Sequence, residues 1–313
     1  INASYGCSLI CRYCWHLGTT GDMLVQPDGS GKNDVVFTYG RNIRYHSPAY
    51  IGEMVSQLRD KYAVDFCTFL DENLMTMDSS SRYTWMPAVC EEWGRRGFAP
   101  DAQGRGGIKW AGTSHASLYR PSTLAAMRAA GCSHLVYGLE SFDPGILKRL
   151  GKGTTRANNI QAVRDTVAAG IAPIPNIIIG FPEETFGSIR NTISGLLELG
   201  IHAKPHFATA YPGSEWYSCF KDDIVVQYAG NLEAYIADLG DATKITATIS
   251  QNFSAIELLG LQEIVARRDM RLLSLAEKNW RPPLTQLVNK KESANFRPTN
   301  KRGPIEIPIK QIA

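Results

Sequence analysis

The chain alternates strand-like and helix-like segments between about residues 47 and 220. Short apolar runs such as 66–70 and 174–179 are separated by stretches whose apolar residues recur at helical spacing, and glycines such as Gly131 predict helix ends. Strands that alternate with helices through short connections form a parallel sheet with helices outside, and right-handed crossovers curl that sheet. Five strands are clear, and a sixth, truncated, precedes Cys7. We therefore expect an α/β fold, a partial (β/α)6 TIM-like barrel with parallel strands.

Three regions are expected along the chain. Residues 1–220 form the barrel core. Residues 221–280 form a helical appendage, because the alternation stops there and Ser254 with Glu257 makes a capping box before an apolar helical repeat. Residues 281–313 are Pro-rich and basic, with seven Lys or Arg against two Glu, and this composition is typical of a loosely ordered tail.

Composition excludes several classes of protein. The net charge of +3 on 313 residues is too small to indicate a nucleic-acid partner. The sequence has neither an apolar run long enough to span a membrane nor a secretory signal. Seven scattered or clustered cysteines do not form the dense framework of a small secreted protein, so we expect a cytoplasmic location. Because the chain begins at Ile1 rather than Met, we also expect that an N-terminal part is missing.

Polar clusters follow the predicted strands at 71–73, 140–141, 180–182 and 211–213. In parallel barrels, functional groups lie on the loops after the C-terminal ends of the strands. These clusters are therefore expected on one rim of the sheet. A cysteine triplet would lie on the same rim, in the loop after the truncated first strand.

The triplet consists of Cys7, Cys11 and Cys14, spaced C-x3-C-x2-C. Iron–sulfur clusters are usually held by four cysteines, so three thiolates leave one iron with an open coordination position. A zinc site formed by the triplet and His16 is the alternative by ligand type. The other four cysteines are expected to be buried apolar residues: Cys67, Cys90, Cys132 and Cys219.

With Tyr13 just before its third cysteine, the segment resembles the signature of the radical S-adenosylmethionine (SAM) superfamily. The resemblance implies a [4Fe-4S] cluster on the three cysteines, with SAM bound at the open iron. It also implies reductive cleavage of SAM to a 5′-deoxyadenosyl radical that abstracts hydrogen from a substrate. An electron donor such as flavodoxin or ferredoxin would then be a partner. The cofactors supply the reactivity, and the protein supplies binding and orientation.

Between about residues 3 and 270 the chain is most similar to the class of this superfamily that carries a cobalamin-binding domain before the barrel. By that resemblance, Asp71 or Glu72 would approach the amino group of SAM, with Asn73 beside it. Asp71 as a helix N-cap is the alternative.

The same resemblance places Glu140 and Ser141 near the ribose hydroxyls, where a carboxylate can accept two hydrogen bonds. It places Ile179 and Gly180 against adenine, with ordinary barrel core as the alternative for the isoleucine. Lys152, in the loop that follows, is expected at the surface rather than against a ligand. Three residues are catalytic candidates, each with a structural alternative: Tyr211, His115 and His206.

The expected function is therefore radical SAM chemistry on a small-molecule or natural-product substrate. If the missing N-terminal part binds cobalamin, methylation of an unactivated carbon or an oxidative cyclisation is expected. Two alternatives stay open: a methylthiotransferase that modifies RNA or protein, for which the C-terminal tail is short, and a non-catalytic protein with a structural zinc ion.

Overall fold

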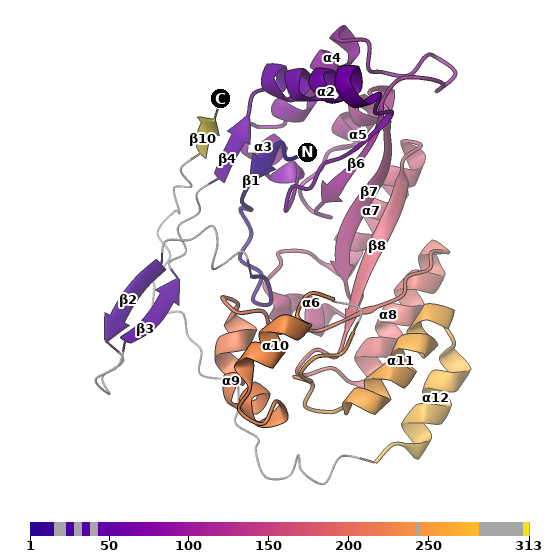
Figure 1. Cartoon of the computed structure of the whole chain (residues 1–313). Coiled ribbons are helices and arrows are strands. Elements are labelled where there is room, and N and C mark those ends of the chain that lie inside the picture. The colour runs from indigo at the N-terminus through magenta and orange to yellow at the C-terminus, as the bar shows by residue number, and fades with distance from the viewer. Residues whose placement is uncertain (16–22, 28–32, 38–42, 242–243, 282–308, 313) are drawn as a thin grey trace.

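The computed structural model describes residues 1–15, 23–27, 33–37, 43–241, 244–281 and 309–312. Its centre is a five-stranded sheet in the order β5-β6-β7-β8-β9, with every neighbouring pair parallel. The strands are β5 (Phe66–Thr68), β6 (Lys109–Ser114), β7 (Cys132–Glu140), β8 (Ala172–Ile179) and β9 (His206–Phe207). Helices cover one face of this sheet and leave the other face open, as Figure 1 shows. This α/β half-barrel confirms the expected fold class.

The helices that cover the sheet begin where the local sequence predicts. Ser47 caps α2 by accepting a hydrogen bond from the Tyr50 N–H, and a proline occupies the first turn. The helix after β8 begins at Phe186, where Thr185 and Ser188 form a capping box. The covering helices are α2 (Pro48–Tyr62), α4 (Trp85–Arg95), α5 (Pro121–Ala129), α7 (Arg156–Ala168) and α8 (Phe186–Leu199).

An aromatic core fills the layer between the sheet and these helices. Trp93 of α4, Trp110 of β6 and Phe69 are each almost fully buried and meet at ring-centroid distances of 5.2–6.2 Å. Both indole N–H groups donate to backbone carbonyls, those of Ile108 and Ala130. Buried indoles need such partners, and the two bonds fix the rings in place.

The sequence of β8 is consistent with the open side of the half-barrel. This strand pairs with β7 over most of its length, but with β9 only at Ile178 and Ile179. Pro173 and Pro175 occupy alternate positions in the part that lacks a second neighbour. Because proline has no N–H to donate, it is tolerated on a free strand edge.

The expected first strand lies beside the sheet but is not part of its ladder. The Ile1 backbone is bonded to Thr68 and Leu70 at the end of β5, at 2.9 Å on each side. The next residues form β1 (Ser4–Tyr5), which pairs antiparallel with β4 (Ile43–His46). The third strand of this small sheet is β10 (Ile309–Ile312), which pairs parallel with β4. Part of the expected tail therefore lies near the N-terminal strand β1.

Sequence patterns did not predict the hairpin β2 (Met23–Pro27) and β3 (Asn33–Phe37) or the short helix α3 (Met75–Ser80). The expected helical appendage contains α10 (Leu232–Asp238), α11 (Ala255–Arg267) and α12 (Met270–Asn279), while α9 (Glu215–Gln227) crosses the expected boundary at residue 220. A last short helix, α6 (Pro144–Leu150), lies below β7. Among the described residues, no helix has the length and apolarity needed to cross a membrane.

Candidate functional site

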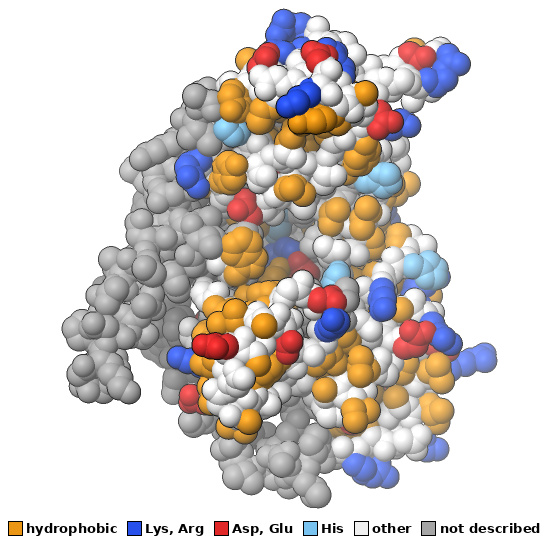
Figure 2. Space-filling view, viewed as in Figure 1, with side chains coloured by type: hydrophobic (Ala, Val, Ile, Leu, Met, Phe, Trp, Pro, Cys, Tyr) orange, Lys and Arg blue, Asp and Glu red, His pale blue; other side chains and the backbone are white. Residues whose placement is uncertain are grey.

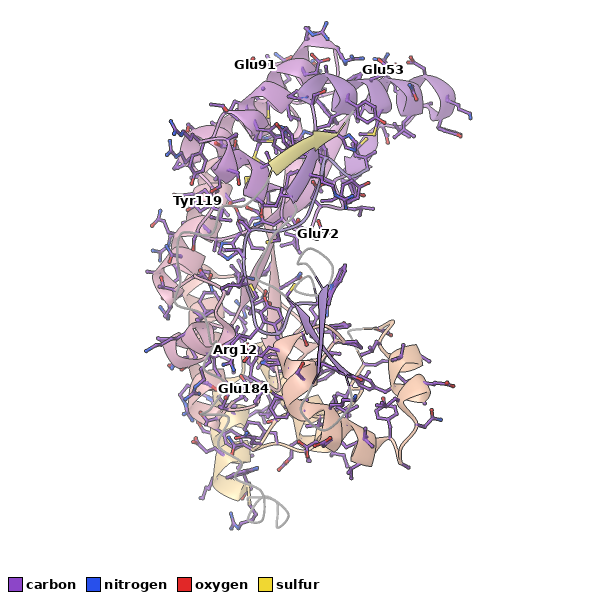
Figure 3. The ribbon with its side chains drawn as sticks, turned by 90° about the vertical axis from the view of Figure 1, so that its left-hand side faces the viewer. Arg12, Glu53, Glu72, Glu91, Tyr119 and Glu184 are labelled. Carbon is purple, nitrogen blue, oxygen red and sulfur yellow. The ribbon has the colours of Figure 1, made fainter. Side chains whose placement is uncertain are left out.

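The three cysteines lie on a loop that is bonded to two helices. The Arg12 N–H donates to the Leu150 carbonyl at the end of α6 at 3.0 Å, and the Arg12 carbonyl accepts from the Glu215 N–H at the start of α9 at 3.0 Å. The Arg12 guanidinium also forms an ion pair with Glu215. Figure 3 shows Arg12 in the lower half of the half-barrel. The loop is thus held by elements some 140 and 200 positions away in sequence.

Burial controls the chemistry of the central thiol. Cys11 is 7% exposed, whereas Cys7 and Cys14 are half-buried. Burial raises the pKa of Cys11 to about 12, Lys152 opposes the rise, and the neighbouring thiols add to it. A thiol in this setting ionises when a metal cation is coordinated, because the cation supplies the missing positive charge. The loop is therefore suited to hold metal rather than a free thiolate.

The thiols do not converge as ligands of one ion would. Among the described residues, no group of three or more His, Cys, Asp or Glu side chains is placed to hold a single metal ion. A cubane cluster has a different requirement, because each thiolate binds a different iron and the sulfurs stay apart. His16, the fourth ligand of the zinc alternative, lies outside the described residues.

The turn after β5 holds the start of the cysteine loop through two acidic residues. Asp71 is 1% exposed, and its carboxylate accepts hydrogen bonds from the Ala3 N–H at 3.0 Å and from the N–H and hydroxyl of Ser4 at 2.5 Å each. Its carboxylate therefore binds Ala3 and Ser4 at the start of β1. It does not cap a helix, which was the alternative expectation. Burial raises the pKa of Asp71, and these hydrogen bonds oppose the rise.

Glu72 and Asn73 follow in the same turn. Glu72 is half-buried and accepts a hydrogen bond from the Gly6 N–H at 3.0 Å. Asn73 is 4% exposed; its Oδ1 accepts from the Met75 N–H, but its Nδ2 has no hydrogen-bond partner within the described parts of the chain. A buried amide donor without a partner is costly and indicates that a ligand completes the site. Gly6 has φ +98°, which favours glycine directly before the first cysteine.

Glu140, at the end of β7, joins the cysteine loop to a buried cation. Its Oε1 accepts from the Tyr13 hydroxyl at 2.8 Å and from the Lys152 ammonium at 2.5 Å. Glu140 has φ +59° and follows a register shift between β7 and β8. Such irregularities at a strand end aim a side chain away from the regular sheet. Figure 2 shows basic and acidic side chains within the recess on the open side of the sheet.

Lys152 is not at the surface, and that expectation was wrong. Its side chain is 7% exposed, pairs with Glu140 and donates to the Gly138 carbonyl. A Cβ on Gly138 would collide with both side chains of the pair, so glycine at this position makes the room they occupy. The glycine two positions before Glu140 was the available sequence signal for a close approach.

His115 holds the backbone of the loop that carries Lys152. Its Nδ1 accepts from the Ser117 N–H at 3.2 Å, and its Nε2 lies 3.1 Å from the Lys152 carbonyl. A carbonyl only accepts, so Nε2 carries the proton and the ring is neutral. Burial lowers the pKa of His115 to about 3, and the Lys152 charge adds to this. Because both ring nitrogens are engaged in this way, the imidazole positions a loop.

The turn after β8 is shaped by a carboxylate that sequence reasoning missed. Glu184 is 1% exposed and accepts from the Gly180 N–H at 2.5 Å. Gly180 has φ +87°, and a Cβ there would press on Leu258 of α11. Ile179 is fully buried beside it. Burial raises the pKa of Glu184 to about 8, and backbone hydrogen bonds from Gly180 and Phe181 oppose this.

The remaining candidates are Ser141, Tyr211 and His206. Ser141 is fully buried, and its hydroxyl bonds to the Thr192 hydroxyl and accepts from the Asp143 N–H. Tyr211 is half-buried in the turn before α9, where burial raises its pKa. His206 starts β9, and its buried Nδ1 lacks a partner within the part of the chain that the structure describes.

The fold and the loop together define an α/β half-barrel in which a loop with three cysteines lies against Glu140 and the 71–73 turn. The model of the radical SAM superfamily matches residues 1–195, which is more than half of the chain. The chain therefore belongs to the radical SAM superfamily. Membership implies a [4Fe-4S] cluster and SAM as cofactors. The three free thiols of the loop and the unpartnered Asn73 amide fit those groups by their chemistry.

Relatives of the chain are methyltransferases. An uncharacterized methyltransferase of Pyrococcus horikoshii is 29% identical over 177 residues, which are 56% of this chain and 36% of the relative. The bacteriochlorophyllide d C-12(1)-methyltransferase of Chlorobaculum tepidum is 29% identical over 122 residues, 38% of this chain and 26% of that protein. The chain thus spans about a third of the length of these relatives.

One solved structure shares the fold at a TM-score of 0.51 and 16% identity. It is the radical SAM methyltransferase TsrM from Kitasatospora setae, with cobalamin and a [4Fe-4S] cluster bound. The match covers 72% of this chain and 39% of that one. At this identity the likeness concerns the fold alone.

Proposed function

We propose that this chain is the catalytic core of a radical SAM methyltransferase that acts on a small molecule. The observation that carries the proposal is the cysteine loop, which lies against Glu140 and the 71–73 turn inside a half-barrel of this superfamily. When bound, the cluster supplies the electron that cleaves SAM to methionine and a 5′-deoxyadenosyl radical. The residues of the chain bind, orient and shield these groups.

The proposed ligands follow from the polar contacts. Cys7, Cys11 and Cys14 hold the cluster. Glu72 is a better candidate than Asp71 for the amino group of SAM, because Glu72 is half-buried, whereas Asp71 is 1% exposed and bonded to Ala3 and Ser4. The free Nδ2 of Asn73 is a donor that suits a carboxylate oxygen.

The proposed nucleoside site lies on the other side of the loop. Glu140 is suited to the ribose hydroxyls, because a carboxylate oxygen accepts more than one hydrogen bond. Tyr13 and Lys152 hold that carboxylate in place, and Lys152 balances its charge in a buried setting. Ile179 and Gly180 are proposed to contact the adenine, and Ser141 supports the strand end from behind.

Methyl transfer is proposed rather than cyclisation because the two curated relatives that match in sequence are methyltransferases. Cobalamin enters the proposal only through the similarity in fold to TsrM, and the described residues do not assign a corrin site. A cytoplasmic electron donor of the flavodoxin or ferredoxin type remains part of the proposal, since the cleavage consumes an electron. Thiomethylation of RNA has no support of this kind.

Anaerobic reconstitution of the full chain with iron and sulfide tests the proposal. We expect visible iron–sulfur absorption, and 5′-deoxyadenosine on addition of SAM and dithionite. Cys11→Ala should abolish both. Cys219 is exposed on α9, so the expectation that it is buried was wrong, and Cys219→Ala should leave both unchanged. Equal cluster content and SAM cleavage in the two variants would contradict the enzyme assignment.

The methyl-transfer part needs a separate measurement. Cell extract incubated with the enzyme and SAM carrying a deuterated methyl group should yield a labelled metabolite, detected by mass spectrometry. Cys11→Ala is the matched negative control. If SAM is cleaved but no label leaves it for any metabolite, the radical chemistry stands and methyl transfer is wrong.

A further inference from the structure

Thr76 of α3 brings a hydroxyl to the first cysteine of the loop. Its Oγ1 lies 3.8 Å from the Sγ of Cys7, within hydrogen-bond range for sulfur, and the residue is fully buried. We infer that Thr76 donates a hydrogen bond to the Cys7 thiolate and so raises the reduction potential of the cluster. The inference rests on the proposed cluster but goes beyond it, because it names what tunes that cluster.

The contact ends an ordered series between two segments. Asp71 holds Ala3 and Ser4, Glu72 holds Gly6, and Thr76 then meets Cys7. The partners advance together along both segments, so the start of the cysteine loop lies in register with the turn after β5. The hydroxyl–sulfur contact is the last step of that register rather than an isolated approach.

The helix that carries Thr76 cannot easily turn away. The Thr76 N–H donates to the Asn73 carbonyl at 3.0 Å. Two residues further on, the buried Asp78 carboxylate accepts from the Met86 N–H at 3.0 Å and from the Thr123 hydroxyl at 3.2 Å. These bonds tie α3 to α4 and α5, so a fixed hydroxyl faces the ligand sulfur.

Chemistry fixes the direction of the bond. A metal-bound thiolate has no proton and can only accept, whereas the threonine hydroxyl can donate. A reduced cluster carries one more negative charge than an oxidised one, so a donor to its sulfur favours the reduced form. Hydrogen bonds to ligand sulfurs are among the factors that set iron–sulfur potentials. Removing the hydroxyl should therefore make the cluster harder to reduce.

The test is a redox titration of the reconstituted full chain without SAM, followed by electron paramagnetic resonance of the reduced cluster. Thr76→Val keeps the branched shape and removes the hydroxyl, Thr76→Ala removes both, and Thr76→Ser keeps the hydroxyl. Thr166→Val is the matched control, at a fully buried threonine of α7 that bonds to Tyr137. A tenfold drop in the ratio of reduced to oxidised cluster at fixed potential corresponds to about 59 mV for one electron.

We expect more negative midpoint potentials for Thr76→Val and Thr76→Ala, and wild-type values for Thr76→Ser and Thr166→Val. Unchanged potentials in the first two variants, or an equal shift in Thr76→Ser, would overturn the inference. Loss of the cluster from both variants, with a normal cluster in Thr76→Ser, would also overturn it, since the hydroxyl would then serve binding instead. If wild-type protein holds no cluster, the proposed function fails as well; a normal wild-type cluster with unshifted variants contradicts only the inference.

Discussion

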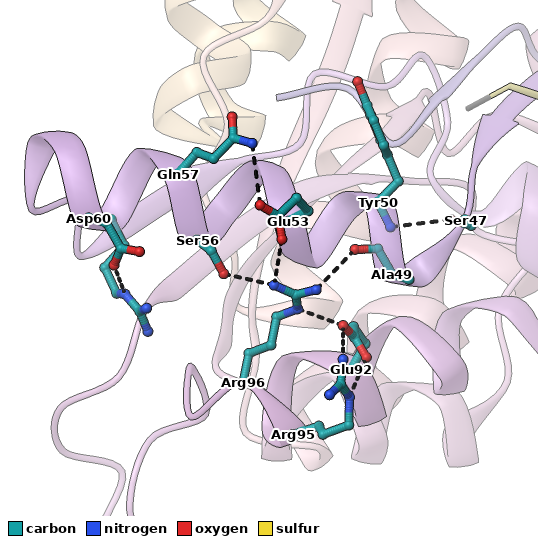
Figure 4. A network of polar contacts seen from close by, with 11 residues as sticks. Ser47, Ala49, Tyr50, Glu53, Ser56, Gln57, Asp60, Glu92, Arg95 and Arg96 are labelled. Atoms are coloured by element: carbon teal, nitrogen blue, oxygen red, sulfur yellow. Dashed lines mark hydrogen bonds and ion pairs between the residues drawn. The ribbon is translucent and has the colours of Figure 1, made fainter.

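The molecule has one network of ion pairs on its outer helices and another inside the half-barrel, and the two differ in exposure to solvent. At the outer helices, Arg96, directly after α4, pairs with Glu92 at 2.6 Å and with Glu53 of α2 at 3.1 Å, as Figure 4 shows. Inside the half-barrel, Lys152 pairs with Glu140 at 2.5 Å. In the outer network Glu53 is 54%, Arg96 21% and Glu92 11% exposed, whereas both side chains of the inner pair are 7% exposed.

The difference in exposure predicts a difference in what each network does. Water and salt reach the outer network at the exposed Glu53, so its pairs contribute less to stability. Water cannot solvate the charges of the inner pair, so loss of one partner leaves the charge of the other buried and uncompensated. An uncompensated buried carboxylate costs far more than a pair on the surface is worth. The inner network is therefore the one that fixes geometry, and it lies beside the cysteine loop through Tyr13.

Breaking the inner pair should give the largest effect. Lys152→Met should lower the free energy of unfolding by about 3–5 kcal/mol, because it strands the Glu140 carboxylate. Urea unfolding of the cluster-free full chain measures this. The double variant Lys152→Met with Glu140→Gln should recover most of the loss. If the free energy of unfolding of the single variant falls by less than about 1 kcal/mol, this pair contributes no more than a surface pair.

Sequence reasoning predicted most of the elements and proposed the ligands, but it missed this network. Cap signals such as Ser47 and a regular alternation are local, so they predicted most helices and strands. Lys152 looked like a surface lysine, since nothing in its local pattern shows that its chain folds back onto Glu140. Thr76 was missed for the same reason, because its partner is 69 positions away.

Within the candidate site, the same physical limit separates the residues. Spacing alone indicated three cysteine ligands, because the three lie within eight positions. The proposed preference for Glu72 over Asp71 needed the structure, since it depends on the burial of Asp71 and its bonds to Ala3 and Ser4. Interactions between distant segments leave no periodic trace in sequence.

The buried carboxyl group of Glu184 provides a second test of how burial changes the contribution of a charged group to stability. The pKa of Glu184 is raised from its ordinary 4.5 to about 8, first by burial. Protonated Glu184 is thus favoured in the folded state, and its contribution is fully present below pH 4.5 and is lost as pH rises towards 8. The free energy of unfolding of the wild type should therefore fall by about 2 kcal/mol between pH 5 and 7, as measured by urea unfolding, and Glu184→Gln should not show this fall. Parallel profiles for wild type and variant would contradict this.

A buried imidazole should give the opposite slope. The pKa of His115 falls from its ordinary 6.5 to about 3, first by burial. Neutral His115 is favoured in the folded state, so its contribution is present above pH 6.5 and is lost as pH falls towards 3. Relative to His115→Gln, wild type should lose about 2 kcal/mol between pH 7 and 5. An unchanged difference between the two across this range would mean that His115 is solvated.

The smallest effect should come from the outer network. Arg96→Met removes the cation that Glu92 and Glu53 share, yet should lower the free energy of unfolding by only about 0.2–1 kcal/mol. Added salt should shrink this difference further, because ions screen exposed charges. Lys152→Met is the comparison, and its cost should change little with salt. If Arg96→Met were as costly and as insensitive to salt as Lys152→Met, burial would not be what separates the two networks, and the special position of Glu140 beside the cysteine loop would need another physical cause.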